Sequence, residues 1–277
     1  MFKTPKGDLE RIAEIDHDLT VWMVPGEFML KDERKLDLLY YAPVPRANVE
    51  AIKAESKYVK EGDGITRGYV TNPWQDIITG IRDFDQLIFD TYERPGWVHE
   101  LINLLWERKL TFINSLPEGE IDSMEIGGGP CGTSMISPRI YEEFIMPIDI
   151  KMVDALHKKC IKVIYHNCGK QMDVFEQMIS TGIDAIETLT PSKHGGDCDN
   201  ISYIKEKYGG KICLIGGFDQ SIFEHGSDDK VRDEVKKLID GYGAVGGYIL
   251  CNTDHFFEAR LENIFEYSNY AKFYGLY

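Results

Sequence analysis

His166 and Cys168 stand two positions apart, at the end of the mostly apolar run Ile161–Tyr165 and just before Gly169. Such a run is typical of a short buried strand, and the glycine marks its end. Residues two apart in an extended chain point to the same face, so we expect the imidazole and the thiol to face one site. Imidazole nitrogen and thiolate sulfur are ligands that zinc favours. The pair therefore predicts part of a zinc site.

Two further ligand types come later in the chain. Glu187 ends the next strand-like segment, and Cys251 ends the last one. In a barrel, the neighbouring strand brings Glu187 beside His166, and closure of the barrel brings Cys251 round toward them. One imidazole, two thiolates and one carboxylate match tetrahedral zinc, with a carboxylate that can leave to admit substrate. The alternative is that His166, Cys168 and Glu187 are strand-end residues that bond loop backbone.

Three more residues are candidates for acid–base catalysis. Glu125 ends an earlier strand-like segment and is either a substrate-binding or acid–base carboxylate, or an ion-pair partner of Arg139. Asp254 and His255 follow the late cysteine closely. Either residue could orient a metal ligand or donate a proton to a leaving oxygen, and His255 could equally be structural.

The remaining candidates would bind a cofactor or substrate. Asp219 follows Gly216-Gly217, where close backbone approach favours a pocket floor, while capping of a helix is the alternative. Tyr69, Asn72 and Trp74 either line the mouth of the pocket or pack in the core.

The elements that must position these residues alternate along the chain. Single helices between strands imply parallel βαβ units. We count seven strands, one short of an eight-stranded barrel, with functional residues at strand ends, as TIM barrels place them. An open doubly wound sheet is the alternative, but no GxGxxG follows the first strand. The predicted strands are residues 19–24, 65–71, 121–126, 161–168, 185–189, 211–218 and 248–251, and the main helices are 47–60, 95–116, 137–159, 172–181, 201–208, 229–240 and 261–273.

Length and composition limit the class of protein to which this chain can belong. The 277 residues fit a single α/β barrel domain over residues 1–277, and the net charge of −15 argues against nucleic acid and anionic membranes as partners. No apolar run reaches the roughly 18 residues that cross a bilayer, and the N-terminus has no apolar signal-peptide centre. Six cysteines in such a chain favour reduced thiols and a cytoplasmic location.

From Gly68 onward the sequence resembles the uroporphyrinogen decarboxylase superfamily. The matching stretches stand in family order at the expected spacing. The resemblance implies a TIM-type (β/α)8 barrel with a family-like part over residues 61–277 and a divergent segment over residues 1–60. The stretches are GYVTNPW (68–74), SPRIYEEFIMP (137–147), HNCGK (166–170), GIDAIETLTP (182–191), HGGD (194–197), LIGGFD (214–219) and GYILCNTDHFFEA (247–259).

Within this superfamily the chain is similar to the corrinoid-dependent methyltransferase branch, which acts with coenzyme M. That branch binds zinc through HxC and a late cysteine, and His166, Cys168 and Cys251 stand at those positions. More distant methionine synthases add a glutamate at the place of Glu187. The resemblance implies a zinc-dependent methyltransferase that moves a methyl group between a small thiol, methyl ether or alcohol and a corrinoid on a partner protein. A homodimer is implied by the family's common habit.

The chain departs from the family at its N-terminus, which is too short for the usual first-strand region. Either an unusual segment replaces the first strand or the barrel is incomplete in this chain. Two rival functions stay open: a metal-free decarboxylase of the uroporphyrinogen decarboxylase type, and a non-catalytic subunit associated with a corrinoid protein. The arginine-bearing loop and early aspartate of true decarboxylases are not found here.

Overall fold

The computed structural model describes residues 2–10, 13–15, 21–23, 28–243, 246–256 and 258–276. The chain divides into two compact units, residues 1–131 with 139–162 and residues 132–138 with 163–277. Each unit is described by itself below. The assignment of residues 1–277 to one barrel domain stays a prediction.

The first unit opens with two small antiparallel hairpins. Strand β1 (Phe2–Thr4) pairs with β2 (Gly7–Leu9), and β3 (Ala13–Ile15) pairs with β4 (Val21–Met23). The predicted strand at residues 19–24 therefore exists in part as β4, but it belongs to a hairpin and not to the main sheet; residues 19, 20 and 24 lie outside the described residues. An apolar run of this length can form either a hairpin strand or a barrel strand. The expected count of seven strands in the main sheet is therefore wrong, because the segment at residues 19–24 does not belong to that sheet.

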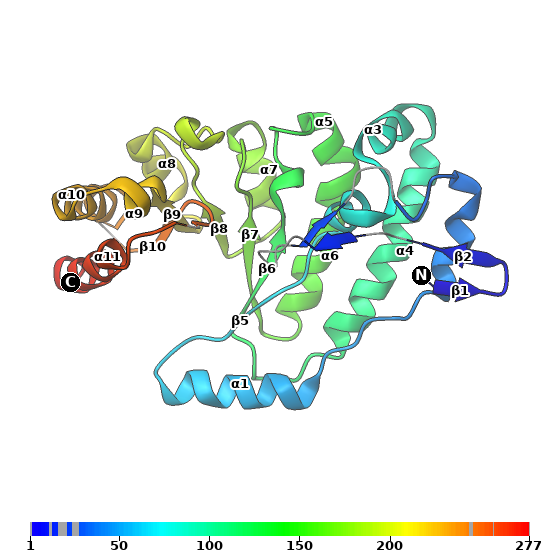
Figure 1. Ribbon diagram of the computed structural model, residues 1–277, viewed down its shortest axis with the longest axis horizontal. Coiled ribbons are helices and arrows are strands. Elements are labelled where there is room, and N and C mark those ends of the chain that lie inside the picture. Colours follow the sequence, from blue (N-terminus) through cyan, green and yellow to red (C-terminus); the bar gives the residue numbers. More distant parts are fainter. Residues whose placement is uncertain are drawn as a thin grey trace. The chain divides into compact units, whose positions relative to one another are not determined.

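The rest of the first unit carries two parallel strands and most of its helices (Figure 1). Strand β5 (Arg67–Tyr69) pairs in parallel with β6 (Ser123–Gly127). A 3-10 helix (Glu33–Tyr41) and the helix Phe84–Glu93 were not predicted from the sequence. The helices are α1 (Val49–Glu61), α2 (Pro73–Asp76), α3 (Phe84–Glu93), α4 (Pro95–Asn114), α5 (Pro138–Ile140) and α6 (Met146–His157), with π-helical turns at Ile77–Ile81 and Tyr141–Ile145.

The second unit alternates strands and helices as predicted. Strands β7 (Lys162–His166), β8 (Ala185–Thr188), β9 (Cys213–Phe218) and β10 (Tyr248–Asn252) follow one another along the chain. The pairs β7–β8, β8–β9 and β9–β10 are parallel. The helices are α7 (Phe175–Ser180), α8 (Ile201–Tyr208), α9 (Ser221–His225), α10 (Asp228–Leu238) and α11 (Leu261–Tyr274), with short 3-10 and π-helical turns at Met172–Val174, Ser192–His194 and Ile239–Gly243. The 3-10 turn Gly129–Cys131 belongs to the first unit.

The strands form one sheet in the order β10-β9-β8-β7-β6-β5. Six parallel strands with intervening helices confirm the predicted α/β class of the TIM-barrel type. Among the described residues, β5 and β10 each have one strand neighbour, so the described strands form an open sheet.

Buried apolar side chains explain why these segments form strands. All four residues of β8 are buried, and so are the three central residues of β7. Parallel strands covered on both faces read as continuous apolar runs, which is how they stand in the sequence. Gly216 allows β9 to approach β8 closely: its φ is +116°, and a Cβ there would lie 1.9 Å from the carbonyl oxygen of Thr188.

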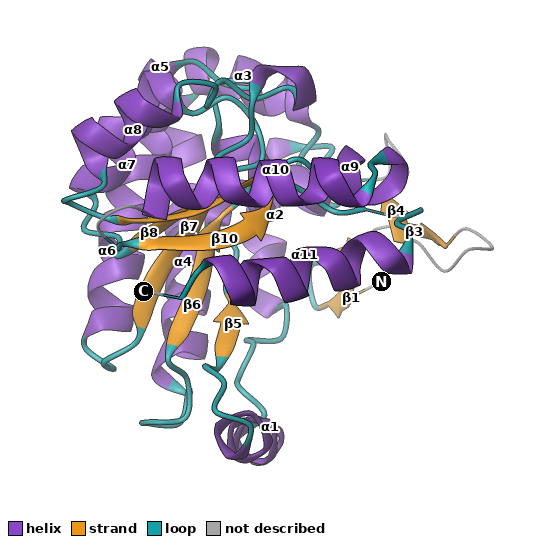
Figure 2. Cartoon of the chain, turned by 90° about the vertical axis from the view of Figure 1, so that its left-hand side faces the viewer, coloured by secondary structure: helices purple, strands orange, loops and turns teal. Residues whose placement is uncertain are grey.

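Capping residues and charged side chains determine where the helices of the second unit begin. Ser227 caps α10 by accepting a hydrogen bond from the backbone N–H of Lys230, and acidic residues fill the first turn. Helices α10 and α11 run side by side (Figure 2), and an ion pair of 2.6 Å joins Arg232 to Glu266. No described helix has the length and apolar character that crossing a membrane requires.

Candidate metal centre and active site

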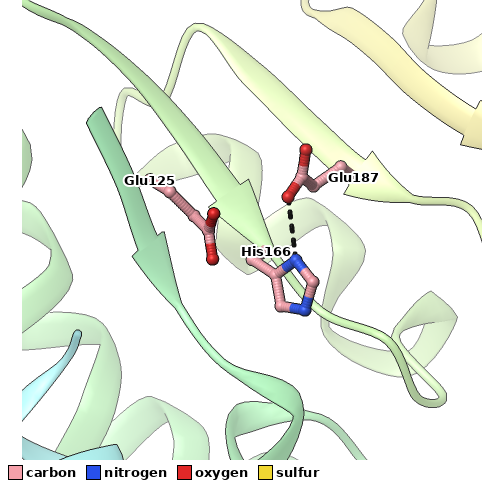
Figure 3. A group of neighbouring side chains, drawn as sticks. All are labelled: Glu125, His166 and Glu187. Atoms are coloured by element: carbon pink, nitrogen blue, oxygen red, sulfur yellow. Dashed lines mark hydrogen bonds and ion pairs between the residues drawn. The ribbon is translucent and has the colours of Figure 1, made fainter. Parts of the chain in front are cut away.

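His166 and Glu187 meet at the carboxyl ends of β7 and β8. The strand register pairs the two residues directly, as the sequence predicted for neighbouring strands. His166 Nδ1 lies 2.8 Å from Glu187 Oε1, and the carboxylate side chain is only 7% exposed (Figure 3). When Nδ1 donates its proton to the carboxylate, Nε2 presents the lone pair of the ring. This is the arrangement of histidines that bind metals through Nε2.

Glu125 lies at the end of β6, where Tyr69 of β5 is its register partner. Arg67, two residues before Tyr69, donates a hydrogen bond of 2.7 Å to Glu125 Oε2. The alternative in which Glu125 pairs with Arg139 is wrong: Arg67 is the observed partner, and Arg139 lies 3.4 Å from Glu143 on the same helical segment.

Glu125, His166 and Glu187 form a group that could hold a metal ion (Figure 3). One ligand atom from each residue lies within 4.8 Å of the others. Two carboxylate oxygens and one imidazole nitrogen suit zinc or a harder divalent metal. Within the described part of the chain this is the one such group, and neither Cys168 nor Cys251 belongs to it.

Cys168 follows β7 in a tight turn. The Asn167 side chain, itself buried, accepts a hydrogen bond of 2.9 Å from the Gly169 N–H and so fixes the turn. The Cys168 thiol is half-buried and in no disulfide. A half-exposed thiol at the end of a strand can reach a ligand, which a core cysteine cannot.

Cys251 lies on β10 and is half-buried. It packs against the core cluster of Ile164, Ala185 and Ile215. Since residues two apart in a strand share a face, Ile164 marks the face of His166, and Ala185 marks that of Glu187. The Cys251 side chain therefore lies on the sheet face that carries the histidine and the glutamate, with its sulfur 3.5 Å from Asn252 Oδ1.

Asp219 ends β9 and collects four hydrogen bonds. Its Oδ1 accepts from the Ser221 N–H at 3.0 Å, from the Ser221 hydroxyl at 2.7 Å and lies 2.6 Å from His194 Nε2, while Lys193 donates to Oδ2. Burial opposes ionisation of the carboxyl group, but the hydrogen bonds from Lys193, Ser221 and His194 outweigh it and lower the pKa of Asp219 to about 2. The residue accepts the backbone N–H of Ser221, the first residue of α9, and lines a cavity.

This lowered pKa predicts a loss of stability in acid. A folded-state pKa below the usual 3.8 stabilises the fold above pH 4, and that contribution is lost as the pH falls toward 2. It amounts to about 2 kcal/mol, of which roughly half is lost between pH 5 and pH 3. We expect the free energy of unfolding, measured with urea at pH 5 and pH 3, to fall by about 1 kcal/mol less in Asp219→Asn than in wild type. Equal falls in the two proteins would contradict this.

Asn72 and Trp74 serve the core of the first unit. Asn72 is buried, caps α2 through the Trp74 N–H at 2.6 Å and donates a 2.5 Å hydrogen bond to Asp149 Oδ1. Trp74 has no exposed surface, so its interpretation as a mouth residue is wrong and the alternative, packing in the core, is correct. Tyr69 is 73% exposed on β5. Cofactor binding by Tyr69, Asn72 and Asp219 stays a prediction.

Asp254 and His255 lie in the loop after β10. Asp254 Oδ1 accepts a 2.7 Å hydrogen bond from the His255 N–H and lies 3.0 Å from His255 Nδ1. The histidine side chain is 83% exposed. The contact with Asp254 holds the His255 imidazole through Nδ1 and leaves Nε2 directed away from the carboxylate. A ring held in this way can transfer a proton from Nε2 to a substrate oxygen.

Sequence reasoning missed Lys193 and His194 as partners of Asp219. The HGGD stretch begins at His194, shortly after the end of β8. Its position after a strand could therefore have indicated that Lys193 and His194 lie near the functional site. Its partner could not be named, because the loops after β8 and β9 meet only in the folded chain.

A parallel α/β sheet with its chemically active side chains at the carboxyl ends of the strands is the arrangement of TIM-barrel enzymes. The particular family is shown by a match to Uroporphyrinogen decarboxylase (URO-D) over residues 47–267, so the chain belongs to this family.

Similar curated proteins are named uroporphyrinogen decarboxylase. The protein of Hydrogenovibrio crunogenus is 26% identical over 164 residues, which are 57% of this chain and 43% of that protein. The protein of Vibrio vulnificus is 24% identical over 232 residues, 77% of this chain and 60% of that protein. The chain thus spans about half the length of the curated relatives it matches.

A methyltransferase from Methanosarcina mazei has a similar solved structure. The TM-score is 0.72 at 16% identity, over 96% of this chain and 76% of that chain. At this identity the likeness establishes the fold.

Proposed function

We propose that this chain is a zinc-dependent methyltransferase that moves a methyl group between a small substrate and a corrinoid carried on a partner protein. The substrate would be a thiol, a methyl ether or an alcohol. The observation that carries the proposal is the contact of 2.8 Å between His166 Nδ1 and Glu187, at the head of the HxC sequence. Membership in the decarboxylase family and the fold shared with a methyltransferase support it.

The donor atoms fit zinc in number and kind. His166 would bind through Nε2, and Cys168 and Cys251 would bind as thiolates. Both cysteines are half-buried and in no disulfide, and Cys251 lies on the face of β10 that corresponds to that of His166. Glu187 would either orient the imidazole or serve as the ligand that leaves when substrate arrives.

A bound zinc ion would lower the pKa of a thiol substrate or polarise the oxygen of a methyl ether or alcohol. The residues of the chain would do the rest. Glu187 would keep His166 in the tautomer whose Nε2 carries a lone pair. His255, held by Asp254, would give a proton to the leaving oxygen of an ether or alcohol substrate. Glu125, fixed by Arg67, would contact the substrate as a carboxylate.

Removal of the metal tests the proposal. The purified protein is expected to contain zinc, and chelation should lower methyl transfer from methylcobalamin to coenzyme M by about 100-fold or more, because a catalytic metal supplies several kcal/mol of stabilisation. Adding back zinc should restore the rate, whereas adding back magnesium should not. Full methyl transfer by the zinc-free protein would contradict the proposal.

A second candidate is a metal-free decarboxylase, which the names of the curated relatives favour. Its test is the same chelated protein, given uroporphyrinogen and assayed for released carbon dioxide. Undiminished decarboxylation with no zinc in the protein would support this second candidate. Zinc-dependent methyl transfer without any release of carbon dioxide would count against it.

A further inference from the structure

Helix α11 of the second unit turns an apolar face to solvent. Leu261, Phe265 and Phe273 are 66%, 65% and 74% exposed, and Leu276, just beyond the helix, is 81% exposed. With 3.6 residues per turn, these four residues fall on one side of the helix, within an arc of about 120°. The other exposed residues of this face are Glu262, Asn269 and Lys272.

The neighbouring helix α10 has the opposite kind of surface. Every exposed residue of α10 is charged, as is typical of a helix that faces water. Helices α10 and α11 lie side by side (Figure 2) and are joined by Arg232 and Glu266. Glu266 is not among the exposed residues of α11, so the apolar face is a separate side of the helix that α10 does not cover.

The size of this face is unusual for a surface that meets only water. Aromatic side chains have about 150–250 Å² of surface each, so Phe265 and Phe273 alone expose roughly 200–350 Å². With the two leucines the patch exceeds the few hundred Å² that monomeric proteins commonly expose. An apolar patch of this size beside polar residues marks a surface for a partner.

The charged residues of the face favour a second copy of the chain as that partner. Glu262 lies in the first turn of α11 and Lys272 in the last, equally far from Tyr267 along the helix. When two copies of α11 pack antiparallel about a two-fold axis level with Tyr267, Glu262 of each copy is therefore level with Lys272 of the other. At the roughly 8–10 Å between the axes of packed helices, these side chains can reach each other.

The same axis also matches the apolar residues. Leu261 and Phe273 are again equally far from Tyr267, so each leucine is level with a phenylalanine of the other copy. Within its own chain Glu262 has only a contact of 3.9 Å with Arg260 among the described residues, and Lys272 has no ion pair there. Both charges are thus available to a second copy.

Two other arrangements suit the face less well. Parallel packing would place each Glu262 beside its own copy, whereas antiparallel packing keeps these like charges about 15 Å apart, beyond the screening length at physiological ionic strength. Antiparallel packing also opposes the two helix dipoles. Helices that lie on membranes are rich in Lys and Arg, whereas this face has one lysine and the chain has a net charge of −15.

We propose that α11 forms the interface of a homodimer, in which the apolar faces of two copies pack antiparallel and the Glu262–Lys272 pairs lie at the two ends. A single helix from each copy gives a small interface, so the dimer is weak, with a Kd on the order of 10 µM. The dimer stands independently of the proposed methyl transfer, because the face contains none of the proposed metal ligands or acid–base residues.

Sedimentation velocity on the full chain, at concentrations from about 1 to 200 µM, tests this proposal. Wild type is expected to be mostly monomeric at the lowest concentration and mostly dimeric at the highest. Phe273→Ser should raise the Kd about 100-fold or more, because it removes one buried aromatic side chain from each copy. The side chain is exposed in the single chain, so the variant should fold; if it does not, Phe265→Ser takes its place.

Charge reversal tests the antiparallel arrangement. Glu262→Lys and Lys272→Glu should each raise the Kd about fivefold to tenfold, because each places like charges together at both ends of the interface. The double variant with both substitutions restores the two ion pairs with their signs exchanged, so its Kd should return to within about twofold of wild type. Glu206→Lys, at an exposed position on α8, is the matched control and should leave the Kd unchanged.

Three results would overturn the proposal. The first is a wild-type chain that stays monomeric at about 200 µM, whether or not a lipid vesicle or another protein then binds the face. The second is a dimer whose Kd does not change in Phe273→Ser, which would place the interface elsewhere. The third is a double charge variant that dimerises no better than the two single variants.

Discussion

Replacing Cys168 with serine is expected to remove bound zinc and to lower methyl transfer by about 1,000-fold, since loss of an outer-shell partner alone costs 10- to 100-fold and a direct ligand costs more. A serine hydroxyl stays protonated at neutral pH and is a harder donor than a thiolate, so it does not replace the sulfur. The side chain is half-buried and in no disulfide, so the substitution should leave the fold intact. Zinc content per chain and the methyl-transfer rate with methylcobalamin are the measurements.

Matched variants make this result specific. Cys160→Ser changes an exposed cysteine outside the site and should keep both zinc and rate. Glu187→Gln should lose less zinc affinity than Cys168→Ser but more than Cys160→Ser. We expect its affinity for zinc to fall about 10- to 100-fold, because the amide holds His166 less strongly than the carboxylate does. Two results together would contradict the thiolate site: Cys168→Ser keeps full zinc content and full methyl-transfer rate, and Glu125→Gln loses its metal. The metal would then be bound by the group of Glu125, His166 and Glu187.

The sequence predicted the His166–Glu187 contact because it depends on local rules. Each residue ends an apolar run, and neighbouring parallel strands place their ends side by side, as the register confirms. The partner of Glu125 depends instead on the register between β5 and β6, which puts Arg67 within 2.7 Å. Spacing along the chain does not specify that register, so Arg67 was not named as the partner, and the alternative partner Arg139 was wrong. Convergence of Cys251 with the histidine stays a prediction.

The same distinction holds for the fold. The six strands of the main sheet were predicted within a few residues, because all except Arg67–Tyr69 are largely apolar runs bounded by turn residues. The segment around Val21–Met23 has a similar pattern, yet it pairs antiparallel with Ala13–Ile15. Its pattern fits either partner, and only the tertiary structure selects between them. Trp74 shows the same limit, since its residue type suits a pocket mouth as well as a core, and only the tertiary structure shows that it is buried.

Asp90→Asn is expected to lower the free energy of unfolding by about 3–5 kcal/mol, the cost of breaking a buried ion pair by removing one partner. Asp90 has no exposed surface, and its carboxylate accepts hydrogen bonds from Arg82 Nε at 2.8 Å and from Arg94 Nη2 at 2.6 Å. The Arg82 side chain is 3% exposed and also donates to the Leu30 carbonyl at 2.8 Å. Without the negative charge, a guanidinium group would stay buried with no counter-charge.

Urea unfolding followed by tryptophan fluorescence measures this effect, because the Arg82 guanidinium lies 5.4 Å from the centre of the Trp97 ring. Asp85→Asn, at an exposed position on the same helix α3, is the matched control and should change stability by no more than about 0.5 kcal/mol. In a double-mutant cycle, Arg82→Met should cost far less in the Asp90→Asn background than in wild type, since the two side chains act as one unit. Additive costs would mean that the pair contributes through packing alone, and the argument from buried charge would then fail.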